Sequence, residues 1–70
     1  MAFINLEMQT ANGQTAIVAP VQYASKDEAE SAWHHACGYA AVSSVEKHTC
    51  MIITDEGEVI RSECYRHKGG

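Results

Sequence analysis

The stretch SKDEAESAWHHACGYAAVSSV, residues 25–45, decides how this 70-residue chain folds, because it is the segment with helical periodicity. Ser25 and Glu28 have the spacing of a capping box, in which the serine hydroxyl accepts from the amide three residues on and the glutamate carboxylate reaches back. Acidic residues crowd the start of the stretch, where the helix dipole favours negative charge. The pattern predicts a helix over about residues 26–45.

One face of the predicted helix carries small side chains around a single large one. At 100° per residue this face comprises Ala29, Ala32, Trp33, Ala36, Cys37, Ala40, Ser43 and Ser44. A small face lets a helix lie close to a sheet, with Trp33 filling the one large gap. Gly38 weakens the helix by about 1 kcal/mol relative to alanine, and it leaves room for a close approach by another molecule.

Strand-like segments flank the helix in pairs. Residues 2–10 alternate between apolar and polar side chains, and Asn12-Gly13 then signals a tight hairpin turn before a second strand at 14–19. Residues 48–54 and 58–66 form the second pair, joined by the turn Asp55-Glu56-Gly57. We expect residues 67–70 to fray. We therefore predict one α+β domain over residues 1–70, with the order ββαββ: a four-stranded antiparallel sheet with the helix packed on one face.

A three-residue turn would pair Ile52 with Ile60, Cys50 with Ser62 and His48 with Cys64. One helix cannot cover both faces of a sheet, and an uncovered apolar face usually marks an interface. We therefore expect a homodimer or higher homo-oligomer, formed through either the uncovered sheet face or an edge strand. The residues predicted to form the oligomer face are Phe3, Met51, Ile53, Val59 and Tyr65.

Composition excludes several classes of function. Nine acidic against five basic residues give a net charge of −4, which disfavours nucleic-acid binding because phosphates must be neutralised by Lys and Arg. The chain has no signal-peptide pattern and no apolar run long enough to cross a membrane, so we expect a cytoplasmic protein without a membrane partner. Three cysteines, an odd number, argue against a disulfide framework.

Candidate chemistry is sparse. His48 and Cys50 share a strand face, with Cys64 opposite in the predicted register, so these three residues could bind zinc, although no Cys-x-x-Cys or His-x-x-x-His spacing supports such a site. Cys37 and His34 could be helix neighbours, but a thiol facing an apolar core is inert. We therefore expect no cofactor and no enzyme activity. A small hydrolase is the remaining catalytic alternative.

Two groups of residues are candidates for binding. His35, Tyr39 and Val42 form a second stripe on the helix, which is either the flank of the core or a contact surface for a partner protein. A small polar pocket at a subunit boundary is the other candidate. Its predicted ligand-binding residues are Tyr23, Ser43, Ser44, His48, Arg61 and Arg66. Helix capping explains the two serines equally well.

The run AAVSSV at residues 40–45, then His48, Asp55-Glu56-Gly57 and Glu63-Cys64-Tyr65, resembles a group of short uncharacterised proteins of gut bacteria and their phages. The resemblance covers about residues 23–67, and its motifs are moderately specific. It implies an accessory role of the kind that phage proteins play against host immunity. Such a protein would be an inhibitor that docks on a host defence protein. The alternatives are a sponge that sequesters a nucleotide-derived immune signal at a subunit interface, and a zinc-stapled scaffold.

Overall fold

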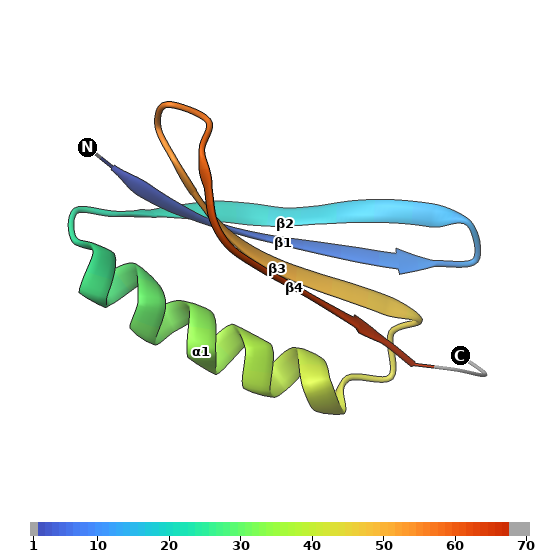
Figure 1. Ribbon diagram of the computed structural model, residues 1–70. Coiled ribbons are helices and arrows are strands. Elements are labelled where there is room, and N and C mark those ends of the chain that lie inside the picture. The colour runs from blue at the N-terminus through green and yellow to red at the C-terminus, as the bar shows by residue number, and fades with distance from the viewer. Residues whose placement is uncertain (1, 68–70) are drawn as a thin grey trace.

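The computed structural model describes residues 2–67, apart from the side chain of Ala19. Two β-hairpins flank one helix along the chain (Figure 1). The elements are β1 (Phe3–Ala11), β2 (Gln14–Tyr23), α1 (Lys26–Val42), β3 (Lys47–Thr54) and β4 (Val59–Arg66). The protein is therefore α+β, in the order that the sequence predicted.

The strands form one antiparallel sheet in the order β2-β1-β3-β4, with the helix lying along one face (Figure 1). The two hairpins join through β1 and β3 at the centre. The predicted end of the second strand at residue 19 is wrong, because β2 includes Pro20 and continues to Tyr23. Proline is tolerated because β2 is an edge strand and the register shifts there: residues 19 and 20 stand opposite Leu6 alone.

Both predicted tight turns are present. Asn12 and Gly13 have φ angles of 55° and 76°, as a two-residue hairpin of the I′ type requires. Gly57 has φ of 87°, and its amide donates to the carbonyl of Thr54 at 3.0 Å. The Thr54 hydroxyl, itself buried, accepts from the amides of Glu56 and Glu58 at 3.2 Å each and so holds this turn closed.

The helix begins where the sequence predicted and ends earlier. Ser25 is the N-cap, and its hydroxyl oxygen accepts from the amide of Glu28 at 3.2 Å. The Glu28 carboxylate bonds the Ser25 hydroxyl at 3.1 Å rather than the Ser25 amide. The predicted end at residue 45 is wrong, because Ser43 is extended and caps the helix: its amide donates to the carbonyl of Ala40 at 3.3 Å. The Ser43 hydroxyl then accepts from the amide of Val45 at 3.1 Å beyond the helix.

The core lies between the small face of α1 and the middle of β3. Its buried hydrophobic residues are Ala29, Trp33, Cys37, Ala40, Cys50 and Ile52. The four helix residues among them all belong to the predicted face. Because three of these are alanine or cysteine, the helix can approach the sheet closely enough for Trp33 to hydrogen-bond to the strand beneath it.

The polar face of β1, and not its apolar face, lies beneath the helix. Asn5 donates to the carbonyl of Ala29 on the helix at 3.0 Å, and Glu7 bonds His48 beneath the helix. Since side chains alternate along a strand, the apolar set of β1 faces away from the helix. With its sheet partners it forms what we call the open face. The open face comprises Ile4, Leu6, Met8, Ile17, Met51, Ile53 and Val59.

The predicted register of the second hairpin is wrong. The structure pairs Ile52 with Arg61 and Ile53 with Val59, so that Ile60 is an extra, bulged residue. Cys64 therefore stands opposite Thr49 and is exposed, rather than opposite His48. The bulge keeps Ile60 packed against the core. It also shifts the residues after Ile60 by one position, so they lie on the opposite side of the sheet from the one that strict alternation predicts.

The structure divides the predicted oligomer face between the two sides of the sheet. Met51, Ile53 and Val59 lie on the open face. Phe3 pairs with the buried Thr54, Tyr65 pairs with the buried His48, and both pack against the helix-side core. These two aromatic residues are therefore on the opposite side of the sheet from the predicted interface.

The C-terminal end of the described chain is better anchored than predicted. The His67 amide donates to the carbonyl of Glu46 at 2.8 Å, and its ring Nε2 donates to the carbonyl of Ala40 at 2.9 Å. The rest of the predicted frayed segment, residues 68–70, lies outside the described residues. Within residues 2–67, no helix has both the length and the apolar character needed to cross a membrane.

Candidate functional site

A groove runs along the helix on the side that faces β2. Its volume is about 440 Å³. The helix contributes one wall and Val18 of β2 the other, with β1 and β3 between them. The residues that line the groove are Glu7, Gln9, Val18, His35, Ala36, Tyr39 and His48. It forms because α1 does not extend over the edge strand, which leaves Val18 and Val21 exposed on the helix side.

The floor of the groove is polar. Nε2 of His48 lies 2.9 Å from Oε1 of Glu7, which joins β3 to β1. The His48 side chain is only 6% exposed, whereas that of Glu7 is 32% exposed and reaches the groove. The other ring nitrogen of His48, Nδ1, is buried without a hydrogen-bond partner. A buried polar atom without a partner is rare in native proteins and calls for an explanation.

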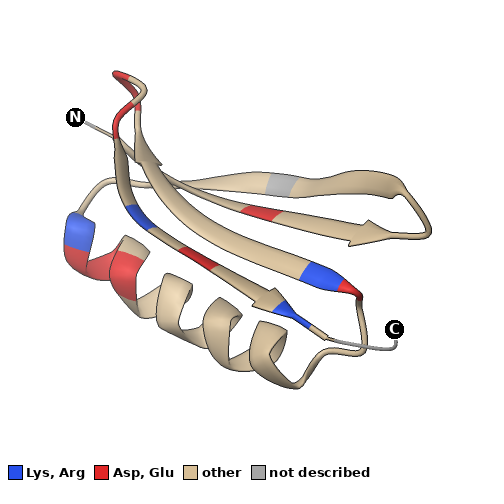
Figure 2. Ribbon diagram, turned by 45° about the vertical axis from the view of Figure 1, so that its right-hand side comes forward, with Lys and Arg blue, Asp and Glu red and all other residues tan. Residues whose placement is uncertain are grey.

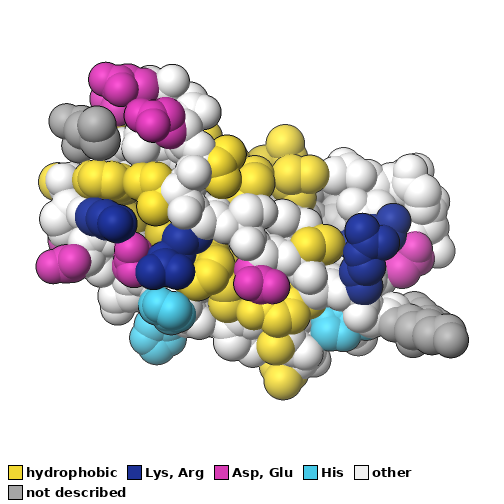
Figure 3. Space-filling view, viewed as in Figure 1, with side chains coloured by type: hydrophobic (Ala, Val, Ile, Leu, Met, Phe, Trp, Pro, Cys, Tyr) yellow, Lys and Arg dark blue, Asp and Glu magenta, His cyan; other side chains and the backbone are white. Residues whose placement is uncertain are grey.

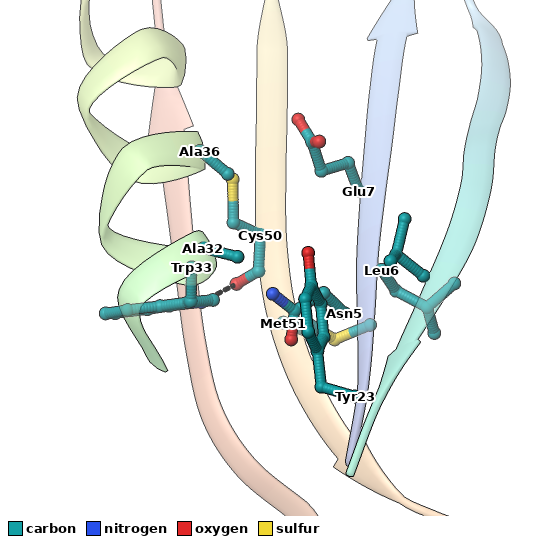
Figure 4. Close-up of a pocket in the computed structure, with 10 residues that line it drawn as sticks. Asn5, Leu6, Glu7, Tyr23, Ala32, Trp33, Ala36, Cys50 and Met51 are labelled. Atoms are coloured by element: carbon teal, nitrogen blue, oxygen red, sulfur yellow. Dashed lines mark hydrogen bonds between the residues drawn. The ribbon is translucent and has the colours of Figure 1, made fainter. Parts of the chain in front are cut away.

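A smaller cavity of about 80 Å³ continues from the groove under the helix, and Glu7 and Ala36 line both. In Figure 4, Tyr23 and Asn5 lie at one end of this cavity and Glu7 at the other, with Cys50 between the helix and the strand. Asn5 uses its amide nitrogen to bond the helix, but its side-chain oxygen is buried without a partner.

Two thiols lie buried beside this floor. Burial raises the pKa of the Cys50 thiol to about 12, and it also raises the pKa of the Cys37 thiol. For Cys37, interactions with Tyr65 and Cys50 partly offset this rise in pKa. Both thiols are therefore protonated at neutral pH, and a protonated, buried thiol is a poor nucleophile.

The outer surface of the helix has an uneven charge distribution. Charged residues occupy its first turns, where Glu30 bonds Arg61 of β4 at 3.1 Å and Lys26 at 3.7 Å. After Glu30 the helix carries no Lys, Arg, Asp or Glu up to its end at Val42 (Figure 2). In the space-filling view, acidic side chains gather instead at the β3–β4 turn (Figure 3).

The exposed part of this uncharged half forms what we call the helix patch: His34, His35, Gly38, Tyr39, Ala41 and Val42. It contains the three residues that the sequence predicted as a partner surface. Tyr39 is 78% and Val42 81% exposed. The alternative, that these residues flank the core, does not fit such exposure. His35 and Tyr39 also line the groove, so patch and groove are continuous.

The structure does not bring together the six residues predicted to bind a ligand. Tyr23 precedes the helix and Ser43 follows it, so the 17-residue helix, about 25 Å long, separates them. Arg61 forms an ion pair with Glu30 near the helix start. Arg66 lies at the far end of the sheet, opposite Lys47 in the strand register. Ser43 serves as the helix cap, Ser44 is exposed, and only His48 reaches the groove.

The structure also separates the three residues that were predicted to bind zinc. His48 and Cys50 do lie together, but Cys64 is across the sheet on the open-face side. Glu7 takes its place: a carboxylate oxygen of Glu7, a ring nitrogen of His48 and Sγ of Cys50 all lie within 4.8 Å of one another. Sequence reasoning missed Glu7, because its role depends on pairing between strands far apart in the chain. The one available signal was its place on the polar side of β1.

Comparisons with protein-family models, with curated proteins and with solved structures find no match to this chain.

Proposed function

We propose that the chain is a small, non-enzymatic binding protein that associates with itself through the open face and docks on a partner protein through the helix patch. The observation that carries the docking proposal is the helix patch itself. Charged residues are depleted and aromatic residues enriched at the centres of protein interfaces. On the helix, a patch without Lys, Arg, Asp or Glu surrounds an exposed tyrosine beside a groove.

Gly38 adds a second argument for docking at the helix patch. A Cβ atom placed at Gly38 would meet nothing within 4 Å. Its φ angle is not positive, unlike those of Gly13 and Gly57. Neither folding nor packing within the chain therefore requires glycine there, although it weakens the helix by about 1 kcal/mol. A partner backbone lying close against the helix supplies a reason for it.

Self-association rests on the open face. Ile17 is 63% and Val59 60% exposed, and they stand on the two edge strands with five further apolar residues between them. Monomeric proteins rarely expose continuous apolar patches of more than a few hundred Å². A second copy of the chain offers a matching apolar face, and two sheets can pack face to face about 10 Å apart.

Several features support a role without catalysis. The two interior thiols have raised pKa values, and the groove is open on one side rather than closed around a substrate. The resemblance to phage and gut-bacterial proteins gives this binding role a setting, in which the partner is a host defence protein and the chain is its inhibitor. The small size and acidic charge of −4 fit that role.

A test of docking uses a photo-crosslinking amino acid placed at position 39 in bacterial cells that carry a phage-defence system. Position 56, in the exposed β3–β4 turn, serves as the matched control. We expect one defence component to crosslink from position 39 and not from position 56. Expression of the chain should restore phage plaques, and Tyr39→Ala should reduce that restoration while Glu56→Ala does not. Equal crosslinking from both positions, or full activity of Tyr39→Ala, would contradict the proposal.

The volume of the groove favours a second candidate function. A pocket of about 440 Å³ lies within the size range of small-molecule sites. Its aromatic and histidine side chains suit the base of a nucleotide-like signal. Its lining within the described residues includes Glu7 and no Lys or Arg, so phosphate groups gain little there. Calorimetric titration with cyclic nucleotides and ADP-ribose derivatives tests this function, and the absence of heat at micromolar protein concentration excludes it.

A further inference from the structure

Three potential metal ligands meet at the floor of the groove. Glu7 comes from β1, and His48 and Cys50 come from β3, two residues apart and therefore on the same side of that strand. Glu7 pairs directly with Cys50 across the sheet. As a result, one donor atom from each side chain lies within 4.8 Å of the other two. The positions are set by backbone pairing rather than by flexible loops.

The buried His48 ring faces this cluster through its Nε2 atom. His48 is 4% exposed, yet its Nδ1 atom has no hydrogen-bond partner. Hydrogen bonding to Glu7 therefore satisfies only one of the two ring nitrogens of a buried histidine. A metal ion bound through Nε2, the nitrogen that faces Glu7, would make Nδ1 the N–H nitrogen and so fix the tautomer of the ring.

The donor set selects the kind of metal. Imidazole, thiolate and carboxylate together suit Zn²⁺, whereas Mg²⁺ and Ca²⁺ require oxygen donors. Charge favours the same ion, because the thiolate and the carboxylate together cancel its two positive charges and leave no net charge in the interior. Zinc binds the thiolate form of cysteine, so the Cys50 thiol must give up its proton when the ion binds. Metal binding therefore breaks the S–H bond, forms the metal–sulfur bond and releases the proton to solvent.

We propose that Glu7, His48 and Cys50 bind one Zn²⁺ ion at the floor of the groove. Three protein donors leave a tetrahedral ion one position short, and the groove that Glu7 and His48 line gives solvent access to it. The ion would connect β1 to β3 at the centre of the sheet. It would stabilise the folded chain through mass action, since the ligands are assembled only in the folded state.

The test is a titration of the purified, metal-stripped full chain with Co²⁺, followed by competition with Zn²⁺. Thiolate ligation gives Co²⁺ an intense charge-transfer absorption band. We expect one Co²⁺ per chain, a charge-transfer band and its loss when Zn²⁺ is added. No saturable binding, or binding without the band, would overturn the proposal.

Three variants assign the ligands. Cys50→Ala should abolish the band, and Cys64→Ser, the matched control on the other side of the sheet, should keep it. Glu7→Gln retains a hydrogen-bonding partner for His48 and should weaken Co²⁺ affinity at least about tenfold. Because Cys50 is buried and its replacement could impair folding, Glu7→Gln, at a half-exposed position, is the decisive variant. Unchanged affinity of Glu7→Gln, or loss of the band in Cys64→Ser, would refute this ligand set.

Discussion

The indole nitrogen of Trp33 donates a hydrogen bond to the carbonyl oxygen of Cys50, 3.1 Å away (Figure 4). This bond joins the middle of the helix to the central strand β3 and fixes the height of the helix above the sheet. It also fixes one wall of the small cavity that continues from the groove. The large side chain of Trp33, 7% exposed, therefore both fills the core and orients the helix.

Replacing Trp33 separates these two contributions. Trp33→Ala should lower the free energy of unfolding by about 3–5 kcal/mol, because it removes the largest side chain of the core. Trp33→Phe keeps an aromatic ring but loses the N–H donor, so we expect a smaller loss. Urea unfolding followed by far-UV circular dichroism measures both. His34→Ala, at the exposed neighbouring position, is the control, and the interpretation fails if Trp33→Phe is as damaging as Trp33→Ala.

Charge on the open face should dissociate the oligomer. The double variant Ile17→Lys and Val59→Lys places two like charges on an apolar face, at positions that are already well exposed in one chain. We therefore expect monomers that remain folded, measured by light scattering and circular dichroism. Val42→Lys, at a still more exposed helix position, should leave the oligomer intact. A wild-type particle of 7.6 kDa at high concentration would show that the open face does not associate.

Gly38→Ala should have opposite effects on folding and on docking. Alanine has space at this position and favours the helix, so the free energy of unfolding should rise by about 0.5–1 kcal/mol. The added methyl group should weaken binding of the crosslinked partner, measured by calorimetry. Ser31→Ala, exposed on the helix before the helix patch, is the matched control. If partner affinity is unchanged, the partner does not lie against Gly38.

The three cysteines should differ in reactivity. Cys64 is exposed, whereas Cys37 and Cys50 are buried with raised thiol pKa values. A thiol reagent should therefore modify one cysteine quickly in the native protein and all three after denaturation. Cys64→Ser should remove the fast phase. Two or more fast thiols in the native wild type would show that the core opens more readily than this packing indicates.

The Glu30–Arg61 pair should make stability depend on pH. The hydrogen bond from Arg61 lowers the pKa of Glu30 below its ordinary value of 4.5. A lowered pKa in the folded state stabilises the fold above pH 4.5, and this stabilisation is lost as the pH falls through the folded-state pKa. The difference in unfolding free energy between wild type and Glu30→Gln should therefore shrink on acidification. A difference that stays constant down to acid pH would contradict this.

His48 shows why burial must guide the choice of variants. Because the sequence names His48 as a predicted ligand-binding residue, His48→Ala is the first variant that it suggests for testing ligand binding. The structure buries this side chain and bonds it to Glu7, so the variant would leave a cavity and an unpaired carboxylate. Tyr39 and Gly38, which are exposed, test docking without that complication.

Local signals in the sequence predicted the elements well. The Ser25 cap, the positive-φ pair Asn12-Gly13 and the small helix face all act within a few residues, so each can be recognised without knowledge of the rest of the fold. The register of β4 was not predictable in this way. Its bulge at Ile60 keeps an apolar side chain in the core, and that preference appears only when the helix is in place above the strand.

The sequence by itself therefore determined the order of strands, turns and helix, because hydrophobic period, capping and turn residues are local properties. Only the tertiary structure decided which face of β1 lies beneath the helix, and hence that Glu7 meets His48 and Cys50 while the apolar side of the strand stays open. Both faces of β1 offered a plausible partner to the helix. The choice between them was made by contacts between residues far apart in the chain, such as Glu7 with His48, which are 41 positions apart.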